Sequence, residues 1–145
     1  MALPTLVIYT TEAEYRNHFI DKYVGQANSV ITFDGLIVRF FPESFDHAFF
    51  TSSRRKFPRK NQFDRDRAER IDWIKYILEN PTMEVYRRVM PNGKMRRIAL
   101  EPTTPYTVIV QINLKYPTQA RFITAYIVNS QSALRKMRSN PKWQG

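Results

Sequence analysis

The second half of the chain has the residue pattern of a β-sheet. Four short runs rich in β-branched and aromatic residues follow one another there: Met83 to Val89, Lys94 to Leu100, Tyr106 to Leu114 and Phe122 to Val128. Asn92-Gly93 separates the first two runs and favours a two-residue hairpin turn. The connections at 101–105 and 115–120 are short enough for antiparallel neighbours. We therefore predict a meander of four strands.

Two amphipathic helices are expected before this meander. The first, at about 11–24, starts with Thr10-Thr11 and acidic residues, which cap a helix and match its dipole. Three- and four-residue spacings give it one apolar face, made of Tyr15, Phe19, Ile20 and Tyr23. The second, Asp64 to Asn80, ends before Pro81, and its apolar stripe consists of Ala68, Ile71, Ile74 and Leu78.

Smaller elements connect and follow these helices. Ser29 to Phe33 and Leu36 to Phe41 predict a hairpin around Asp34-Gly35. We expect a short helix over Pro42 to Phe50. We also expect a final basic helix over Ser130 to Arg138. The stretch from Thr51 to Phe63 is polar, basic and interrupted by Pro58, so we expect a loop that can close on a ligand.

The order of helices followed by strands predicts an α+β fold, with helices packed on one face of an antiparallel sheet of about four strands. A chain of 145 residues, 43% of them hydrophobic, is long enough for one domain with a core of its own. We expect a single domain over 1–145, with the basic loop at about 51–63 and a short basic C-terminal tail.

Charge and composition narrow the function. The formal charge of +10 favours phosphate-bearing partners, RNA and DNA first, or anionic membrane surfaces. The absence of cysteine excludes disulfides, cysteine-ligated zinc and thiol nucleophiles, and two histidines leave little for a metal site. No apolar run approaches the roughly 20 residues that span a bilayer, and no secretory signal is evident. We expect a cytoplasmic protein with no membrane partner, metal or cofactor.

His47 is the most informative single residue. Histidine is the side chain suited to proton transfer near neutral pH, and His47 precedes the densest basic cluster, in which Arg54, Arg55, Lys56, Arg59 and Lys60 surround Phe57. Metal-free attack on a phosphodiester needs such a proton-transferring group beside permanent cations. Phe57 adds an aromatic ring on which a base could stack. The alternative is an ordinary histidine beside a solvated loop.

Further cations and hydroxyls complete a hypothetical site. Arg54, Lys56, Arg67 and Arg70 are candidate phosphate ligands. Strand alternation over 122–127 places Phe122, Thr124 and Tyr126 on one face and the intervening residues on the other, although an ordinary solvent-facing strand would look the same. The arginines around Asn92-Gly93 could extend the groove or protect a strand edge from aggregation; they are Arg87, Arg88, Arg96 and Arg97.

Three motifs, in this order, resemble those of the phage-associated nucleases of the barnase, EndoU, colicin E5/D and RelE-like (BECR) superfamily. They are His47-Ala48-Phe49, Arg67-Ala68-Glu69-Arg70-Ile71-Asp72-Trp73-Ile74 and Phe122-Ile123-Thr124-Ala125-Tyr126. The resemblance spans roughly residues 30–130. It implies a metal-independent endoribonuclease with its site on the exposed face of a four-stranded sheet, used as a toxin or phage effector.

The resemblance also implies roles for individual residues. His47 would be the general acid or base, Arg70 the phosphate-binding cation, and Thr124 with Tyr126 the hydroxyls at the scissile phosphate. Arg54 and Lys56 match no motif position. EndoU-type sites use two histidines, and because His18 lies outside the matched region, a one-histidine arrangement is the better analogy.

Several alternatives stay open at the level of sequence. The carboxylate that usually accompanies a single histidine could be Glu69, Glu84 or Glu101, or no carboxylate takes part. A toxin of this charge would need an acidic inhibitor or immunity protein in the producing cell. The leading hypothesis is cleavage of RNA by attack of its 2′-hydroxyl. The alternatives are a non-catalytic nucleic-acid-binding or phage packaging protein, and a structural phage component.

Overall fold

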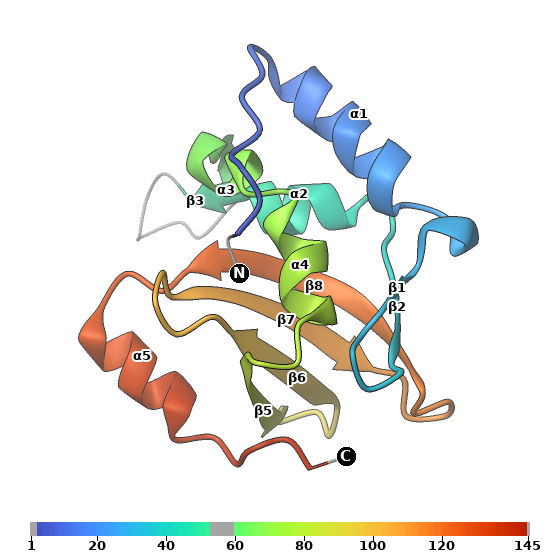
Figure 1. Ribbon diagram of the computed structural model, residues 1–145, viewed down its shortest axis with the longest axis vertical. Coiled ribbons are helices and arrows are strands. Elements are labelled where there is room, and N and C mark those ends of the chain that lie inside the picture. Colours follow the sequence, from blue (N-terminus) through green and yellow to red (C-terminus); the bar gives the residue numbers. More distant parts are fainter. Residues whose placement is uncertain (1–2, 53–59, 145) are drawn as a thin grey trace.

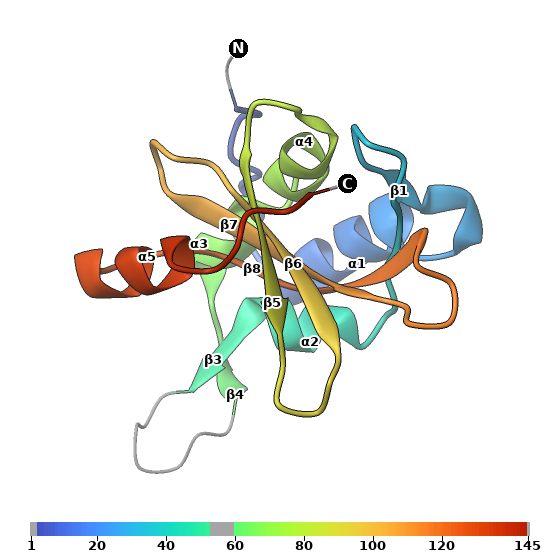
Figure 2. The same cartoon turned by 90° about the horizontal axis from the view of Figure 1, so that it is seen from below.

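The computed structural model describes residues 3–52 and 60–144. Within them, one sheet has six strands in the order β1-β2-β8-β7-β6-β5 (Figures 1 and 2). Its strands are β1 (Val30–Ile31), β2 (Ile37–Arg39), β5 (Glu84–Val89), β6 (Met95–Leu100), β7 (Tyr106–Ile112) and β8 (Gln119–Ile127). Neighbouring strands are antiparallel except β2 and β8, which are parallel. The α+β prediction is therefore confirmed.

The sheet is larger than the predicted four strands because the β1–β2 hairpin joins the meander. The four strands β5 to β8 pair in sequence order, as predicted. Gly93 adopts φ +83° in the turn between β5 and β6, a conformation that favours glycine. β2 then pairs with the first three residues of β8, from Gln119 to Arg121. Beyond Arg121, that edge of β8 lies beside α2 (Ser44–Phe49) instead.

The helices that precede the meander cover one face of the sheet (Figure 1). The N-terminus of α1 (Glu12–Tyr23) carries a reciprocal capping box between Thr11 and Glu14. Its buried residues are Tyr15, Phe19 and Tyr23, whereas the predicted core residue Ile20 is 38% exposed. Phe19 packs against aromatic rings of β8, α2 and the end of β2, which form the centre of the core: Phe40, Phe45, Phe49 and Phe122.

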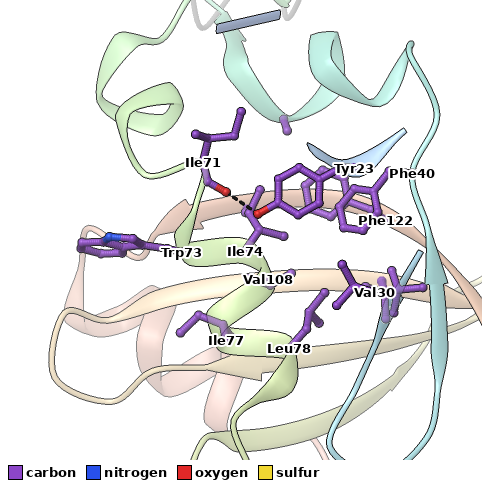
Figure 3. Close-up of a cluster of buried hydrophobic side chains, with 14 of the residues drawn as sticks. Tyr23, Val30, Phe40, Ile71, Trp73, Ile74, Ile77, Leu78, Val108 and Phe122 are labelled. Atoms are coloured by element: carbon purple, nitrogen blue, oxygen red, sulfur yellow. Dashed lines mark hydrogen bonds between the residues drawn. The ribbon is translucent and has the colours of Figure 1, made fainter. Parts of the chain in front are cut away.

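The long helix predicted over Asp64 to Asn80 is two helices. They are α3 (Arg65–Glu69) and α4 (Trp73–Glu79), separated at Arg70, which has the non-helical ψ of 18°. The buried hydroxyl of Tyr23 donates to the Ile71 carbonyl at 2.7 Å (Figure 3). It also accepts from the Lys75 backbone N–H at 3.2 Å. This hydroxyl satisfies backbone groups that the break releases, so a residue distant in sequence stabilises the interruption.

The opposite face of the sheet is covered in part by α5 (Gln131–Arg138), contrary to the prediction that helices occupy one face only. Leu134 and Met137 of this helix pack on a second, smaller core formed by β5 to β8 and Val128. Figure 2 shows α5 beside the sheet. The residues after α5 run along β5, where the Trp143 N–H donates to the Val85 carbonyl at 2.9 Å. One part of this face therefore stays uncovered by helices among the described residues.

The predicted loop at 51–63 begins and ends in strands. β3 (Phe50–Ser52) and β4 (Lys60–Phe63) pair antiparallel as a second, two-stranded sheet. A short 3-10 turn, η1 (Gln26–Asn28), follows α1. Over the described ranges, no helix has the length and apolar character needed to cross a membrane.

Candidate functional site

A row of polar side chains crosses the face of the sheet that carries α5. In the strand register, Arg88 is opposite Arg96, Arg96 opposite Gln111, and Gln111 opposite Arg121. The row continues to Arg39 of β2, which is the partner of Arg121. Residues that are partners across neighbouring strands point to the same face at a spacing of about 4.8 Å. We call these five residues the arginine row.

No described carboxylate neutralises the charge of the arginine row. Among the described residues, no carboxylate comes within 4.0 Å of Arg39, Arg88, Arg96 or Arg121. The buried Nε of Arg96 also has no hydrogen-bond partner there. Like charges opposite each other destabilise a sheet, and an unmade buried hydrogen bond costs free energy. An anion bound on the row would remove both penalties.

His47 lies beside the middle of this row. It is exposed on α2, next to the edge of β8 that β2 no longer covers. A cleft of about 430 Å³ opens between α2 and the sheet, and its polar lining consists of Ser44, His47, Arg96, Gln111, Arg121 and Thr124. We call it the His47 pocket. Of the four predicted catalytic residues, His47 and Thr124 line this cleft, together with two guanidinium groups, and Arg70 and Tyr126 do not.

A β-bulge in β8 sets the position of Thr124. Ile109 is opposite Thr124 but Val110 is opposite Phe122, so Ile123 has no partner. The bulge breaks the alternation expected from sequence: Phe122 is in the main core, on the face opposite to Thr124 and Tyr126. The prediction that Phe122 shares their face is wrong. The Thr124 Oγ1 is buried without a hydrogen-bond partner among the described residues and lines the His47 pocket.

Arg70 lies at a different place. It ends α3, where its Nη1 donates to the Asp66 carbonyl at 2.6 Å and its guanidinium lies 5.2 Å from the Trp73 ring centre. The hollow that it lines also contains the carboxylates of Asp64 and Asp66. Because the helix breaks at Arg70 rather than continuing along the sheet, Arg70 is not among the residues of the His47 pocket.

Tyr126 and Arg67 form a pair near α5. The Arg67 guanidinium lies 5.2 Å from the centre of the Tyr126 ring, and both line a cleft between the sheet and α5. Burial raises the pKa of the Tyr126 hydroxyl above its usual value, against the opposing effect of Arg67 and Arg88. This hydroxyl is therefore a proton-bearing donor at neutral pH. Tyr126 shares the face of Thr124 but is not part of the His47 pocket.

The predicted basic cluster is only partly described. Arg54, Arg55, Lys56, Phe57 and Arg59 lie outside the described residues, and Lys60 begins β4. β3 starts directly at the end of α2, and the Asp64 N–H, which follows β4, donates to the Phe49 carbonyl at 2.7 Å.

The three candidate carboxylates have partners elsewhere. Glu69 pairs with Arg65 at 3.4 Å, and Glu84 with Arg138 at 2.9 Å. Glu101 accepts hydrogen bonds from the hydroxyls and backbone N–H groups of Thr103 and Thr104 in the turn between β6 and β7. None of them lines the His47 pocket.

His18 has a network of its own on the outside of α1. Its Nε2 lies 2.8 Å from the Asp72 carboxylate, and its Nδ1 lies 2.8 Å from the Tyr9 hydroxyl. The network ties the N-terminal segment to the α3–α4 junction. Among the described residues, no group of three or more histidine or acidic side chains could hold a metal ion.

The functional residues that sequence reasoning missed are those of the arginine row. Arg88 and Arg96 were recognised only as cations around a hairpin, while Arg39, Gln111 and Arg121 carried no motif. What unites these residues is that they lie on one face of five neighbouring strands. Which residues share that face depends on the register in which the strands pair. Register becomes visible only when the sheet order is known.

Comparisons with known proteins give no family for this fold and site. No model of a protein family matches the chain, and no significant match was found among curated proteins or solved structures.

Proposed function

We propose that the protein is a metal-independent endoribonuclease and that the His47 pocket is its active site. The observation that carries the proposal is the lining of this pocket. It combines one titratable ring with two guanidinium groups, a threonine hydroxyl and no carboxylate. Such a set suits a substrate that is negatively charged and whose reaction requires proton transfer.

In the proposed reaction, the 2′-oxygen of RNA attacks the adjacent phosphorus while the bond to the 5′-oxygen breaks. His47 takes the proton from the 2′-hydroxyl and later releases it to solvent, while a water molecule on the opposite side of the phosphorus protonates the departing 5′-oxygen. Arg96 and Arg121 neutralise the charge that builds on the phosphoryl oxygens, and Thr124 donates a hydrogen bond to one of them. The products are a 2′,3′-cyclic phosphate and a 5′-hydroxyl, which balances the proton transferred.

This assignment changes the roles implied by the family resemblance. His47 and Thr124 keep theirs, whereas the phosphate-binding role passes from Arg70 to Arg96 and Arg121. Membership of the barnase, EndoU, colicin and RelE-like superfamily is part of the same proposal, supported by a basic α+β frame with the candidate site on its sheet. An effector or toxin role, with RNA as substrate and an acidic inhibitor as partner, would follow from that membership.

Cleavage of labelled RNA in EDTA tests the proposal. We expect the wild-type protein to produce ends with a 2′,3′-cyclic phosphate and His47→Ala to lose this activity. His18→Ala, purified in parallel, is the matched control, because it removes the other imidazole outside the pocket. Equal cleavage by the wild-type protein and His47→Ala would exclude His47 as the proton-transferring group.

A non-catalytic nucleic-acid-binding protein is the second candidate. It is favoured by one observation: the arginine row extends over five strands, well beyond a site for one phosphate. In that case RNA would remain intact, and a complex with steep salt dependence would form.

A further inference from the structure

A second cleft adjoins the His47 pocket at the β2 end of the arginine row. Its lining includes Arg39, Phe41, Lys94, Gln111, Asn113 and Arg121, and we call it the Phe41 pocket. Gln111 and Arg121 line both clefts, so the two are neighbouring parts of one groove. The groove continues past the site of the proposed reaction.

The Phe41 pocket offers a flat surface for a planar ligand. The Arg121 guanidinium lies 5.2 Å from the centre of the Phe41 ring, and both groups face the cleft. An aromatic ring together with a guanidinium plane forms the kind of platform on which unpaired bases stack. An aliphatic cleft would give no preference for planar rings.

Amide side chains lie around this platform. The Asn113 Oδ1 accepts the backbone N–H groups of Lys115 and Tyr116 at 3.0 and 3.1 Å, which fixes the amide and leaves its NH₂ group for a ligand. Gln111 provides a second amide in the same lining. Amides both donate and accept hydrogen bonds, as the edges of nucleobases require.

Among the described residues, every charged side chain in the lining of this pocket is cationic. Arg39, Lys94 and Lys115 surround the platform. A nucleic-acid strand alternates negatively charged phosphates with planar bases, and cations beside an aromatic platform can bind both parts. A paired base in a duplex is already stacked between its neighbours and cannot occupy the platform, which makes a single strand the matching ligand.

We propose that the Phe41 pocket binds one nucleobase of a single strand whose adjacent phosphate lies in the His47 pocket. The inference rests on the proposed function only in placing the adjacent phosphate in the His47 pocket, because binding of the base does not require cleavage. It makes the ligand of the groove a single-stranded nucleic acid of at least two nucleotides.

Binding of DNA strands, which lack the 2′-hydroxyl and stay intact, tests this inference. The probes are a fluorescein-labelled thymidine hexamer, a DNA hairpin in which six thymidines pair with six deoxyadenosines, and a hexamer of abasic deoxyribose residues, all measured by fluorescence anisotropy. We expect the single strand to bind more tightly than the other two. Phe41→Ala should weaken binding of the thymidine strand about 5- to 100-fold and change binding of the abasic strand less than twofold.

Two further variants separate stacking from loss of folding. Tyr116→Ala removes an exposed ring from the β7–β8 connection that does not line the pocket, and it should leave the preference for bases unchanged. Phe41→Trp should restore the preference that Phe41→Ala loses. The unchanged affinity of Phe41→Ala for the abasic strand shows that the variant is folded.

Equal losses on the base-bearing and abasic strands, or none on either, would overturn the inference. Competition by polyglutamate as strong as that by the thymidine hexamer, and insensitive to Phe41→Ala, would identify an acidic peptide site instead. A wild-type protein that binds the hexamer as expected but leaves RNA intact would contradict the proposed function and leave this inference standing.

Discussion

Arg96 and Arg121 lie on the same face of the sheet, separated only by Gln111 on the strand between them. This relationship joins two cations from distant parts of the chain beside His47. The backbone hydrogen bonds of three strands fix it, so the cations do not depend on a flexible loop for their position. It is the main reason to assign phosphate binding to this pocket.

Removing one cation of the row should lower the salt dependence of nucleic-acid binding. For Arg88→Met we expect the slope of log affinity against log salt to fall by about 0.7 on single strands. Arg87→Met is the matched control, because Arg87 is the adjacent exposed residue and points to the other face of β5. Binding isotherms of an oligonucleotide at several salt concentrations measure the slopes. Equal reductions in both variants would mean that net charge, and not the row, governs binding.

Thr124→Val should separate function from stability. The Thr124 Oγ1 is buried without a partner among the described residues, so its replacement should keep the free energy of unfolding or raise it by about 1 kcal/mol. Cleavage of RNA should slow about 10- to 100-fold, since the hydroxyl would no longer donate to the phosphate.

Thr107→Val provides the comparison for this variant. The buried Thr107 hydroxyl donates to the Ala99 carbonyl at 3.2 Å, so its loss should cost about 1 kcal/mol of stability and leave cleavage by the folded protein unchanged. Urea unfolding and single-turnover cleavage distinguish the two variants. A Thr124→Val protein that is destabilised yet fully active would contradict the role given to Thr124.

Tyr23→Phe should weaken the junction between α3 and α4. The variant loses the hydrogen bonds of the Tyr23 hydroxyl with the Ile71 carbonyl and the Lys75 N–H in a buried environment. We expect a loss of about 1–3 kcal/mol in the free energy of unfolding, measured by urea denaturation with unchanged m-value. An unaltered denaturation midpoint would mean that the break in the helix does not depend on this hydroxyl.

Acid should destabilise the fold through Asp34. Burial acts to raise the pKa of Asp34, but hydrogen bonds from Arg97 and Thr32 outweigh it, and the pKa lies below the ordinary 3.8. Because the folded pKa is lower than the unfolded one, the stabilisation is present above about pH 4 and is lost as the pH falls through the folded value. Arg97, only 2% exposed and 2.7 Å from Asp34, then loses its charge partner.

The variant Asp34→Asn isolates this contribution. We expect a lower stability at neutral pH and a smaller further decrease between about pH 5 and pH 3 than in the wild-type protein. Thermal unfolding at a series of pH values gives the comparison. Parallel curves for both proteins would show that Asp34 does not contribute to the acid sensitivity.

Local patterns predicted the elements whose causes are local. The capping box at Thr11, the turn at Asn92-Gly93 and the β-branched and aromatic runs of β6 and β7 each act within a few residues, and the corresponding elements are present. The break at Arg70 could not be read in this way, since the Tyr23 hydroxyl that satisfies it lies about fifty positions away. The apolar stripe over Asp64 to Asn80, taken alone, predicted one continuous helix.

The candidate site likewise combines residues recognisable from the local sequence with residues that depend on strand pairing. His47 and Thr124 were found from their chemistry, but Arg39, Gln111 and Arg121 depend on which residues are partners across the sheet. The parallel pairing of β2 with β8 and the bulge at Ile123 both change that register, and neither has a signature in a single sequence. The sequence-based choice of Arg70 relied on a motif whose helical context the fold does not keep.

The most direct test of the central claim compares an RNA strand with its 2′-O-methyl counterpart in EDTA. Both should bind the wild-type protein, but only the strand with free 2′-hydroxyls should be cleaved, giving 2′,3′-cyclic phosphate ends, and His47→Ala should cleave neither. Cleavage of both strands, or of neither by the wild-type protein, would contradict the assignment of the His47 pocket as a ribonuclease site.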